Sequence, residues 1–272
     1  MFGSRRYRGK VAVVTGATGG LGRALCRAYA DLGADIGLLD LAGTDLDGVA
    51  AEIGRTGVRC VPHPCDVTDE DGCHAAIGAV TRELGGVDVL VNNAGITQRS
   101  AFADTSTAVY RRVMDVNFFG SLHCTRAALP ALVQRRGQIA VISSVAGFAP
   151  LLGRTGYAAS KYALRGFFGS LAAELRDDGV GVTMVHPTFI DTGLDKRALG
   201  EDGGVTSHPQ SKVGQQLLPE HVAREVAHAT ARRQRTLVLG RVGHISRMIN
   251  AHAPGLYERI MARSLRGELQ RG

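Results

Sequence analysis

Short apolar runs alternate with longer amphipathic stretches along most of the chain. The runs are rich in Val, Ile and Leu, which is typical of strands buried on both faces. Strands are expected at 11–14, 36–39, 58–61, 87–91, 138–142 and 180–185. Helical spacing of apolar residues predicts helices at 21–31, 46–54, 70–84, 109–135 and 157–177. The alternation predicts an α/β fold with a doubly wound parallel sheet between two helical layers.

The regular alternation ends after residue 185. Residues 193–218 are rich in Gly and polar residues and show no clear period, so we expect a substrate lid that contains a short helix. A helix at 219–233 and a strand at 236–239 follow. We expect a single domain over 1–272, with a cofactor-binding and catalytic core at 8–192 and an amphipathic tail at 244–272.

The tail carries apolar residues at roughly helical spacing, interleaved with arginines. The apolar residues are Ile245, Met248, Ile249, Leu256, Ile260 and Met261, and the arginines are Arg247, Arg259 and Arg263. One interpretation is packing on its own domain or on another subunit. The other is a helix at a membrane surface or at the substrate entrance.

Composition and charge narrow the classes of protein. With 272 residues, 44% hydrophobic and 21% charged, the chain has the make-up of an ordinary globular protein rather than a disordered one. The formal net charge is +7, yet the basic residues are dispersed and there is no Trp. A nucleic-acid-binding face would gather basic residues with aromatics between them, so we expect no nucleic-acid partner.

Cysteines and histidines suggest no metal site. The five cysteines are odd in number and include no C-x-x-C pair, so we expect no disulfide framework. Cys60, His63 and Cys65, followed by Cys73 and His74, match none of the usual zinc spacings. We expect reduced thiols and no bound metal.

The chain shows no targeting or membrane-spanning segment by pattern. The basic start is followed by an apolar run at 11–14 that is too short for a signal peptide. No stretch approaches the ~20 uninterrupted apolar residues of a transmembrane helix. The cytoplasm is the compartment we expect.

A glycine-rich turn joins the first strand to the first helix. The sequence TGATGGLG, residues 15–22, places Gly16, Gly20 and Gly22 where backbone amides converge at a helix N-terminus. Such a turn suits a pyrophosphate, because glycine lets the backbone approach it closely. The spacing differs from G-x-G-x-x-G, and a plain strand-to-helix turn is the alternative interpretation.

Asp40 ends the second predicted strand, at about the distance from the turn expected for an acid that binds ribose hydroxyls. Its carboxylate would repel a 2′-phosphate, and no basic residue follows directly at Leu41. We therefore expect NAD rather than NADP. Asp66 and Val67 after the third strand, and residues 92–95 (NNAG) after the fourth, place further groups at the same sheet edge.

Tyr157 and Lys161 lie one helical turn apart, so their side chains share a face. An ammonium beside a phenol favours the phenolate, which predicts a lowered pKa for Tyr157 and efficient proton exchange with an alcohol. Ser144 ends a strand at the same edge as the glycine turn. Taken singly, a solvated Tyr–Lys pair and a turn serine are the alternatives.

Together these motifs resemble the short-chain dehydrogenase/reductase family. The resemblance covers about residues 9–195, in the family's order of TGATGGLG, Asp66, NNAG, Asn117, Ser144 and Y-A-A-S-K. It implies a Rossmann-type fold and a catalytic tetrad of Asn117, Ser144, Tyr157 and Lys161. By this resemblance Tyr157 is the general acid/base, Lys161 binds the nicotinamide ribose, Ser144 holds the substrate oxygen and Asn117 supports a relay water.

The resemblance and the turn indicate one set of cofactor-binding residues. These are Gly16, Thr18, Gly20, Leu21, Gly22, Asp40, Leu41, Asp66, Val67, Asn93, Ala94, Gly95, Tyr157, Lys161, Pro187, Ile190 and Thr192. One departure lies beside them, since Thr188 stands where the family usually has Gly after Pro. Its Cβ is expected near the nicotinamide face, where it would alter the pocket.

We expect an NAD(H)-dependent enzyme that interconverts a secondary alcohol and a ketone. Substrate contacts are assigned to Ser144, Phe148, Leu151 and Tyr157, and the similarity of 160–175 to the hydroxysteroid-dehydrogenase-like branch suggests a lipophilic substrate, steroid-like or long-chain. The alternatives are a 3-oxoacyl-thioester reductase, or a non-catalytic nucleotide-binding scaffold or sensor. The family resemblance further implies a homodimer or homotetramer.

Overall fold

The computed structural model describes residues 6–211 and 214–269. Within these ranges, parallel strands form one seven-stranded sheet in the order β3-β2-β1-β4-β5-β6-β7. The strands are β1 (Val11–Thr15), β2 (Asp35–Asp40), β3 (Cys60–Pro64), β4 (Val89–Asn92), β5 (Gln138–Ile142), β6 (Gly181–His186) and β7 (Thr236–Val238). Strands β1, β4 and β5 are buried along their whole length, which matches their continuous apolar runs.

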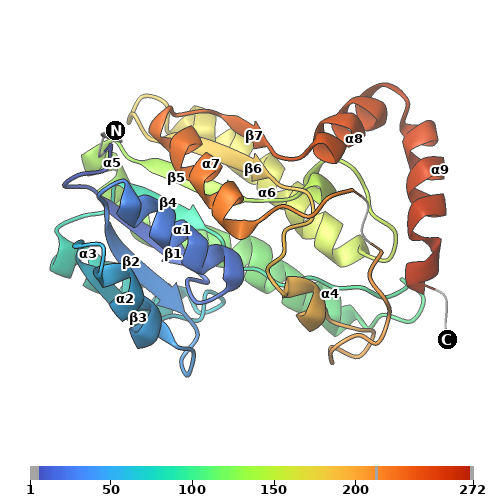
Figure 1. The fold of residues 1–272 in the computed structure, drawn as a ribbon, viewed down its shortest axis with the longest axis horizontal. Coiled ribbons are helices and arrows are strands. Elements are labelled where there is room, and N and C mark those ends of the chain that lie inside the picture. Colours follow the sequence, from blue (N-terminus) through green and yellow to red (C-terminus); the bar gives the residue numbers. More distant parts are fainter. Residues whose placement is uncertain (1–5, 212–213, 270–272) are drawn as a thin grey trace.

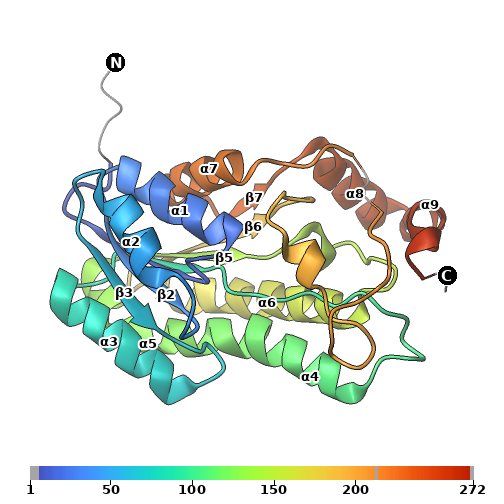
Figure 2. The same cartoon turned by 60° about the horizontal axis from the view of Figure 1, so that its bottom comes forward.

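Helices cover both faces of the sheet (Figures 1 and 2). One core cluster contains side chains of α1 (Gly20–Asp31), α2 (Leu46–Gly54) and α7 (Pro219–Ala231). The other contains side chains of α3 (Glu70–Leu84), α5 (Gly120–Arg135) and α6 (Thr155–Glu174). The predicted doubly wound, three-layer α/β architecture is therefore confirmed.

The direction of winding reverses between β1 and β4. From β1 the chain proceeds to β2 and β3, and it then returns to β4 on the other side of β1. Diverging connections leave a crevice at the carboxyl ends of these two strands, the usual ligand position in such a sheet.

Two predicted helices are interrupted. The stretch 109–135 forms α4 (Thr107–Met114), a wide π-helical turn at Asp115–Phe119, and α5. The tail forms α8 (Arg241–His252) and α9 (Pro254–Leu265), followed by a 3₁₀ turn at Arg266–Leu269. A single tail helix is wrong because Pro254 disfavours helical geometry at Ala253, whose φ is −143°. None of the helices in the described ranges is long and apolar enough to cross a bilayer.

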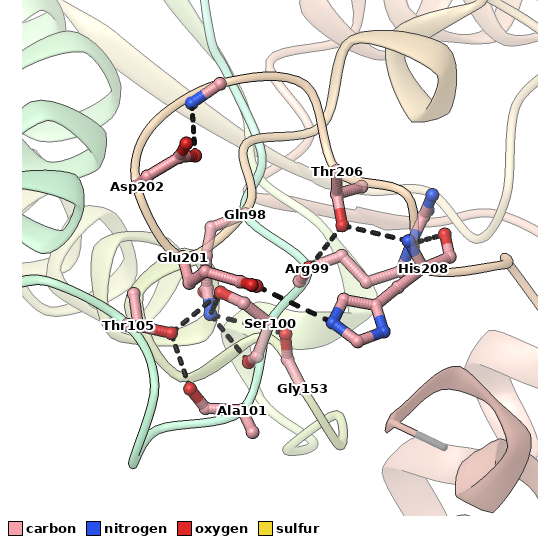
Figure 3. A network of polar contacts seen from close by, with 11 residues as sticks. Gln98, Arg99, Ser100, Ala101, Thr105, Gly153, Glu201, Asp202, Thr206 and His208 are labelled. Carbon is pink, nitrogen blue, oxygen red and sulfur yellow. Dashed lines mark hydrogen bonds and ion pairs between the residues drawn. The ribbon is translucent and has the colours of Figure 1, made fainter. Parts of the chain in front are cut away.

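The predicted lid is tied to the loop that follows β4. Its short helix lies at Leu194–Arg197. Leu199 then exchanges backbone hydrogen bonds with this loop, donating to the Thr97 carbonyl (2.8 Å) and accepting from the Arg99 amide (2.9 Å). Farther along the lid, the Thr206 hydroxyl donates to the Arg99 carbonyl at 2.9 Å (Figure 3).

Gln98 joins the same loop to the segment before α6. Its Nε2 donates to the carbonyls of Ser100 (3.1 Å) and Gly153 (3.3 Å), as Figure 3 shows. Its Oε1 accepts from the Gly156 amide at 3.2 Å. Three segments far apart in sequence, namely 97–105, 153–156 and 199–208, thus form one polar network beside the crevice.

Candidate active site

A cleft of about 1210 Å³ follows the carboxyl edge of the sheet. Every residue assigned above to cofactor binding lines this cleft, including the glycine turn and Thr192. Ser144, Leu151, Tyr157 and Lys161 line it too. The structure thus places the glycine turn and the Tyr–Lys pair in one continuous cavity.

The glycine turn is closed tightly by Gly16 and Gly22. Gly16 adopts φ +64°, a left-handed conformation that favours glycine. A Cβ placed on Gly22 would lie 1.9 Å from the Gly16 carbonyl oxygen. Neither position therefore tolerates a side chain.

The N-terminus of α1 opens into the cleft without a cap. Its N-cap residue, Gly19, offers no side-chain acceptor, and the first turn contains no acidic residue. Helix N-termini carry unpaired amides and a partial positive charge, which suit an anion. Gly20 and Leu21 line the cleft at this point, so the arrangement fits a cofactor's pyrophosphate.

Asp40 is held rigidly against the glycine turn. Its Oδ2 accepts from the Thr18 amide (2.8 Å) and the Thr18 hydroxyl (2.6 Å), and its Oδ1 accepts from the Leu41 amide (2.8 Å). The nearby Arg23 is turned away toward Asp45 and Glu52 and does not line the cleft. A fixed carboxylate therefore stands at this end of the cleft.

Asn93 joins the ends of β1 and β4. Its Nδ2 donates to the Thr15 carbonyl at 2.8 Å, and the Thr15 hydroxyl accepts from the amides of Asn93 and Ala94 at 3.0 Å. Asp66, beyond β3, accepts from both the amide and the hydroxyl of Thr68. These local bonds fix the backbone that borders the cleft.

Lys161 points from α6 toward the end of β5. Its Nζ donates to the Ile142 carbonyl at 2.9 Å and lies 5.6 Å from the centre of the Tyr157 ring. Complete burial lowers the pKa of Lys161 to about 8. The buried Lys161 ammonium therefore loses its proton more readily than an ammonium in water does.

The pKa of Tyr157 differs from the prediction. Burial raises the pKa of Tyr157, and hydrogen bonding to Ser144 and the charge of Arg154 only oppose that rise. The expected lowering by Lys161 is not found: the Lys161 ammonium donates to the Ile142 carbonyl and is not among the groups that lower the pKa of Tyr157. The cation that opposes the rise in the pKa of Tyr157 is Arg154, a residue that no sequence motif singled out.

A buried histidine supports Ser144. The Nδ1–H of His186 donates to the Ser144 carbonyl at 3.0 Å. Burial lowers the pKa of His186 to about 4, so the ring is neutral at physiological pH. His186 directly precedes Pro187 and thereby connects the ends of β5 and β6.

Asn117 lies in the π-helical turn and is fully buried. Its Oδ1 accepts from the Ile96 amide (2.8 Å), and its Nδ2 donates to the Ile96 carbonyl (3.0 Å) and the Ser160 hydroxyl (2.9 Å). Its side chain does not line the cleft. Asn117 thus fixes the backbone next to Gly95 and the face of α6 next to Lys161.

Thr188 is accommodated by glycines at the start of α8. A Cβ on Gly240 would lie 2.5 Å from the Thr188 Oγ1, and one on Gly243 would lie 3.2 Å from its Cγ2. Thr188 lines the cleft, but its side chain packs against this helix start. The glycines at the start of α8 therefore leave room for the Thr188 side chain, which stands where the family usually has glycine.

Phe148 lies outside the cleft, contrary to its assignment to substrate. Its ring packs edge-on against His186, with centroids 5.1 Å apart, and it belongs to a small core cluster with Val145 and Tyr257. Leu151, three residues on, does line the cleft. The turn after Ser144 rotates Phe148 inward, which apolar character alone could not reveal.

The tail packs on its own domain, one of the interpretations of its apolar spacing, and contacts the loop 148–154 at alternate residues. The contacts join Asn250 Nδ2 to the Phe148 carbonyl, Tyr257 Oη to the Pro150 carbonyl, the Leu152 amide to Met261 Sδ, and Arg154 to Glu268. Alternate residues of the loop are thus bound by successive residues of the tail. Because this loop leads directly to Tyr157, the tail forms one wall of the active site.

The buried charge of Lys161 predicts a pH-dependent stability. The folded pKa of about 8 lies below the ordinary value of 10.5, so the unfolded chain binds more protons between these values. Stability should therefore rise with pH across this window. In urea unfolding, the stability of Lys161→Met relative to wild type should fall by about 3 kcal/mol from pH 7 to 10.5.

The exposed Lys196, replaced by Met, serves as the control and should show no such trend. A difference between Lys161→Met and wild type that stays constant with pH would contradict the assigned burial cost.

Comparisons with known proteins agree with this geometry. The family model described as short chain dehydrogenase matches residues 10–202. The chain is 36% identical to Dehydrogenase/reductase SDR family member 7B of Bos taurus, over 96% of this chain and 83% of that protein. It is 30% identical to Dehydrogenase/reductase SDR family protein 7-like of Drosophila melanogaster, over 96% and 83%.

A solved structure shares the fold. It is an alcohol dehydrogenase from the archaeon Thermococcus sibiricus, complexed with 5-hydroxy-NADP. The TM-score is 0.74 at 26% identity, over 85% of this chain and 95% of that one.

Proposed function

The chain belongs to the short-chain dehydrogenase/reductase family of oxidoreductases, and we propose that it is an NAD(H)-dependent enzyme interconverting a secondary alcohol and a ketone. One observation carries the proposal. A single cleft joins a glycine turn with a fixed carboxylate to a serine, a tyrosine and a lysine. The first set fits a dinucleotide, and the second fits proton exchange at an alcohol oxygen.

The residues present fit a nicotinamide cofactor. The uncapped N-terminus of α1 suits its pyrophosphate, and Asp40 suits its adenosine ribose hydroxyls. Lys161 and Ile190 line the cleft farther along, toward the reacting end. When bound there, the cofactor supplies the hydride or accepts it.

Tyr157 and Ser144 handle the substrate oxygen. In the direction of reduction, the Tyr157 hydroxyl gives its proton to the oxygen as the alcohol forms. In the direction of oxidation, Tyr157 takes the proton back. The Ser144 hydroxyl donates a hydrogen bond to the same oxygen and so orients it, while the charge of Arg154 opposes the rise in the pKa of Tyr157 that burial causes.

The substrate is proposed to be lipophilic. The cleft is lined beyond Tyr157 by the apolar side chains of Ile96, Leu151, Phe189, Ile260 and Met261. Such a wall suits a long-chain or steroid-like body. A panel of secondary alcohols and ketones, followed by the absorbance of reduced nicotinamide, should rank these above small polar alcohols.

Asp40 is proposed to select NAD. With both cofactors compared in the same assay, kcat/KM should favour NAD by about 10- to 100-fold, because the fixed carboxylate repels a 2′-phosphate. The double variant Asp40→Ser/Leu41→Arg should reverse the preference. Asp47→Ser, in the exposed first turn of α2, is the matched control and should retain it. A preference for NADP in the unaltered protein would refute this part of the proposal.

A further inference from the structure

Two buried arginines line the cleft beside the Tyr–Ser pair. Arg99 is 6% exposed and Arg154 is 4% exposed. Arg99 lies in the loop after β4, and Arg154 directly precedes α6, three residues before Tyr157. Arginines are rarely buried without partners, so the hydrogen bonds of both guanidinium groups bear on what the cleft binds.

The Arg154 guanidinium has hydrogen-bond partners at only part of its donors. Its Nη1 donates to the Leu152 carbonyl (3.3 Å) and forms an ion pair with Glu268, whose side chain is fully buried. Its Nη2 is buried and has no hydrogen-bond partner. A buried donor left without an acceptor is unfavourable, and a ligand oxygen would satisfy it.

Arg99 adds a second cation at the same place. Its Nε donates to the His208 carbonyl at 3.0 Å (Figure 3). Burial lowers the pKa of Arg99, repulsion from Arg154 lowers it further, and Glu268 and Asp195 oppose the change. The Ser100 amide donates to the Gly153 carbonyl at 3.0 Å, so the segments that carry Arg99 and Arg154 lie side by side. Glu268 is ion-paired with Arg154 and offsets part of the effect of that charge on Arg99, while Asp195 is partly exposed on the lid.

Gln210 carries a second unpartnered atom in the cleft wall. Its Oε1 is buried without a hydrogen bond. The next residue, Ser211, donates its amide to the Glu268 carboxylate at 2.7 Å, which ties this part of the lid to the arginine cluster. Turning the amide about its last torsion would present Nε2 donors instead.

Most of the rest of this wall is apolar. Apart from Ser264, it is formed by Leu151 from the loop before α6 and by Tyr257, Ile260, Met261 and Leu265 from α9. A guanidinium fork matches the oxygens of a carboxylate or a phosphate, whereas apolar walls suit a hydrocarbon body. The two features together define an amphiphilic ligand.

We propose that the substrate is an amphiphilic ketone or secondary alcohol whose carboxylate or phosphate group is bound by Arg99 and Arg154. This inference adds an anionic group to the substrate of the proposed function. It rests on that function only for the ketone or secondary alcohol that reacts. Glu268 is a positioning residue in this arrangement, because its carboxylate orients Arg154 from the tail.

Direct binding tests the inference without turnover. In fluorescence titrations of the full-length protein, 11-(dansylamino)undecanoic acid should bind about 10- to 100-fold more tightly than its methyl ester. Competition by dodecanoate and by monododecyl phosphate then distinguishes the two anions, since the better competitor identifies the group. Equal affinity for the acid and its ester would overturn the proposal.

Variants assign the preference to the arginines. Replacing Arg154 alone leaves Glu268 buried without a partner, so the double variant Arg154→Gln/Glu268→Gln keeps the pair neutral. This variant and Arg99→Gln should each reduce the preference for the acid to less than about threefold while leaving binding of the ester unchanged. Arg263→Gln, exposed on α9 and away from the cleft, is the control.

An unchanged preference in both cleft variants would refute the assignment. The outcome is separable from that of the proposed function. Selective binding of the acid without nicotinamide-linked turnover would refute the proposed function and support the anion site. Turnover of neutral ketones without selectivity for the acid would do the reverse.

Discussion

Replacing Tyr157 by phenylalanine should lower kcat by about 10³-fold while leaving nucleotide affinity within a factor of about two. The substitution removes only the hydroxyl that we propose exchanges a proton with the substrate oxygen. The ring, which lies 5.6 Å from the Lys161 Nζ, keeps its packing on α6. Steady-state rates with a substrate from the panel, together with quenching of reduced-nicotinamide fluorescence, measure the two effects separately.

Tyr162→Phe is the matched control on the same helix. Tyr162 is 41% exposed and does not line the cleft, so its loss should leave kcat unchanged. Full activity in Tyr157→Phe would refute the assigned proton transfer. A fall in the control as large as in the variant would show instead that α6 tolerates no change.

The pH profile should report the raised pKa of Tyr157. Burial opposes formation of the phenolate, and the charge of Arg154 favours it. A substrate anion bound at Arg154 would cancel part of that charge. In the proposed function, the electrostatics of proton transfer and of substrate recognition are therefore linked through Arg154, which composition and motif spacing could not indicate.

The sheet could be predicted because its strands are buried on both faces. Residues 138–142, for example, are apolar except Gln138 and form β5 over the predicted range. Less exact was β3, whose residues are only partly buried at the edge of the sheet, so that the predicted 58–61 is observed as Cys60–Pro64. The pattern of apolar residues therefore predicts buried strands accurately and predicts strands at the edge of the sheet less accurately.

The site could be predicted where its residues follow strand ends. Gly16, Asp66 and Ser144 were placed at the cleft because parallel strands deliver their carboxyl ends to one edge. No comparable rule predicts contacts between segments that are distant in sequence. The pairing of Arg154 with Glu268 joins residues 114 positions apart, and nothing local distinguishes either from a solvated charge.

Gly22→Ala should abolish nucleotide binding and lower the free energy of unfolding by at least about 3 kcal/mol. The new Cβ would lie 1.9 Å from the Gly16 carbonyl oxygen and 2.9 Å from the Ala17 Cα. Both are backbone atoms, so no side chain can rotate to relieve the overlap. Relief requires α1 to move away from β1, which opens the turn that presents the amides of α1 to the cleft.

Gly19→Ala in the same turn is the matched control. Its φ is −68°, and a Cβ there would approach the Gly16 carbonyl oxygen only to 3.5 Å, an ordinary contact. We therefore expect a change in the free energy of unfolding below about 1 kcal/mol. Urea unfolding measures the stability of both variants, and titration with reduced nicotinamide dinucleotide measures binding by Gly22→Ala. Equal stability in the two variants would show that the close approach of helix to strand at Gly22 is not what shapes the nucleotide turn.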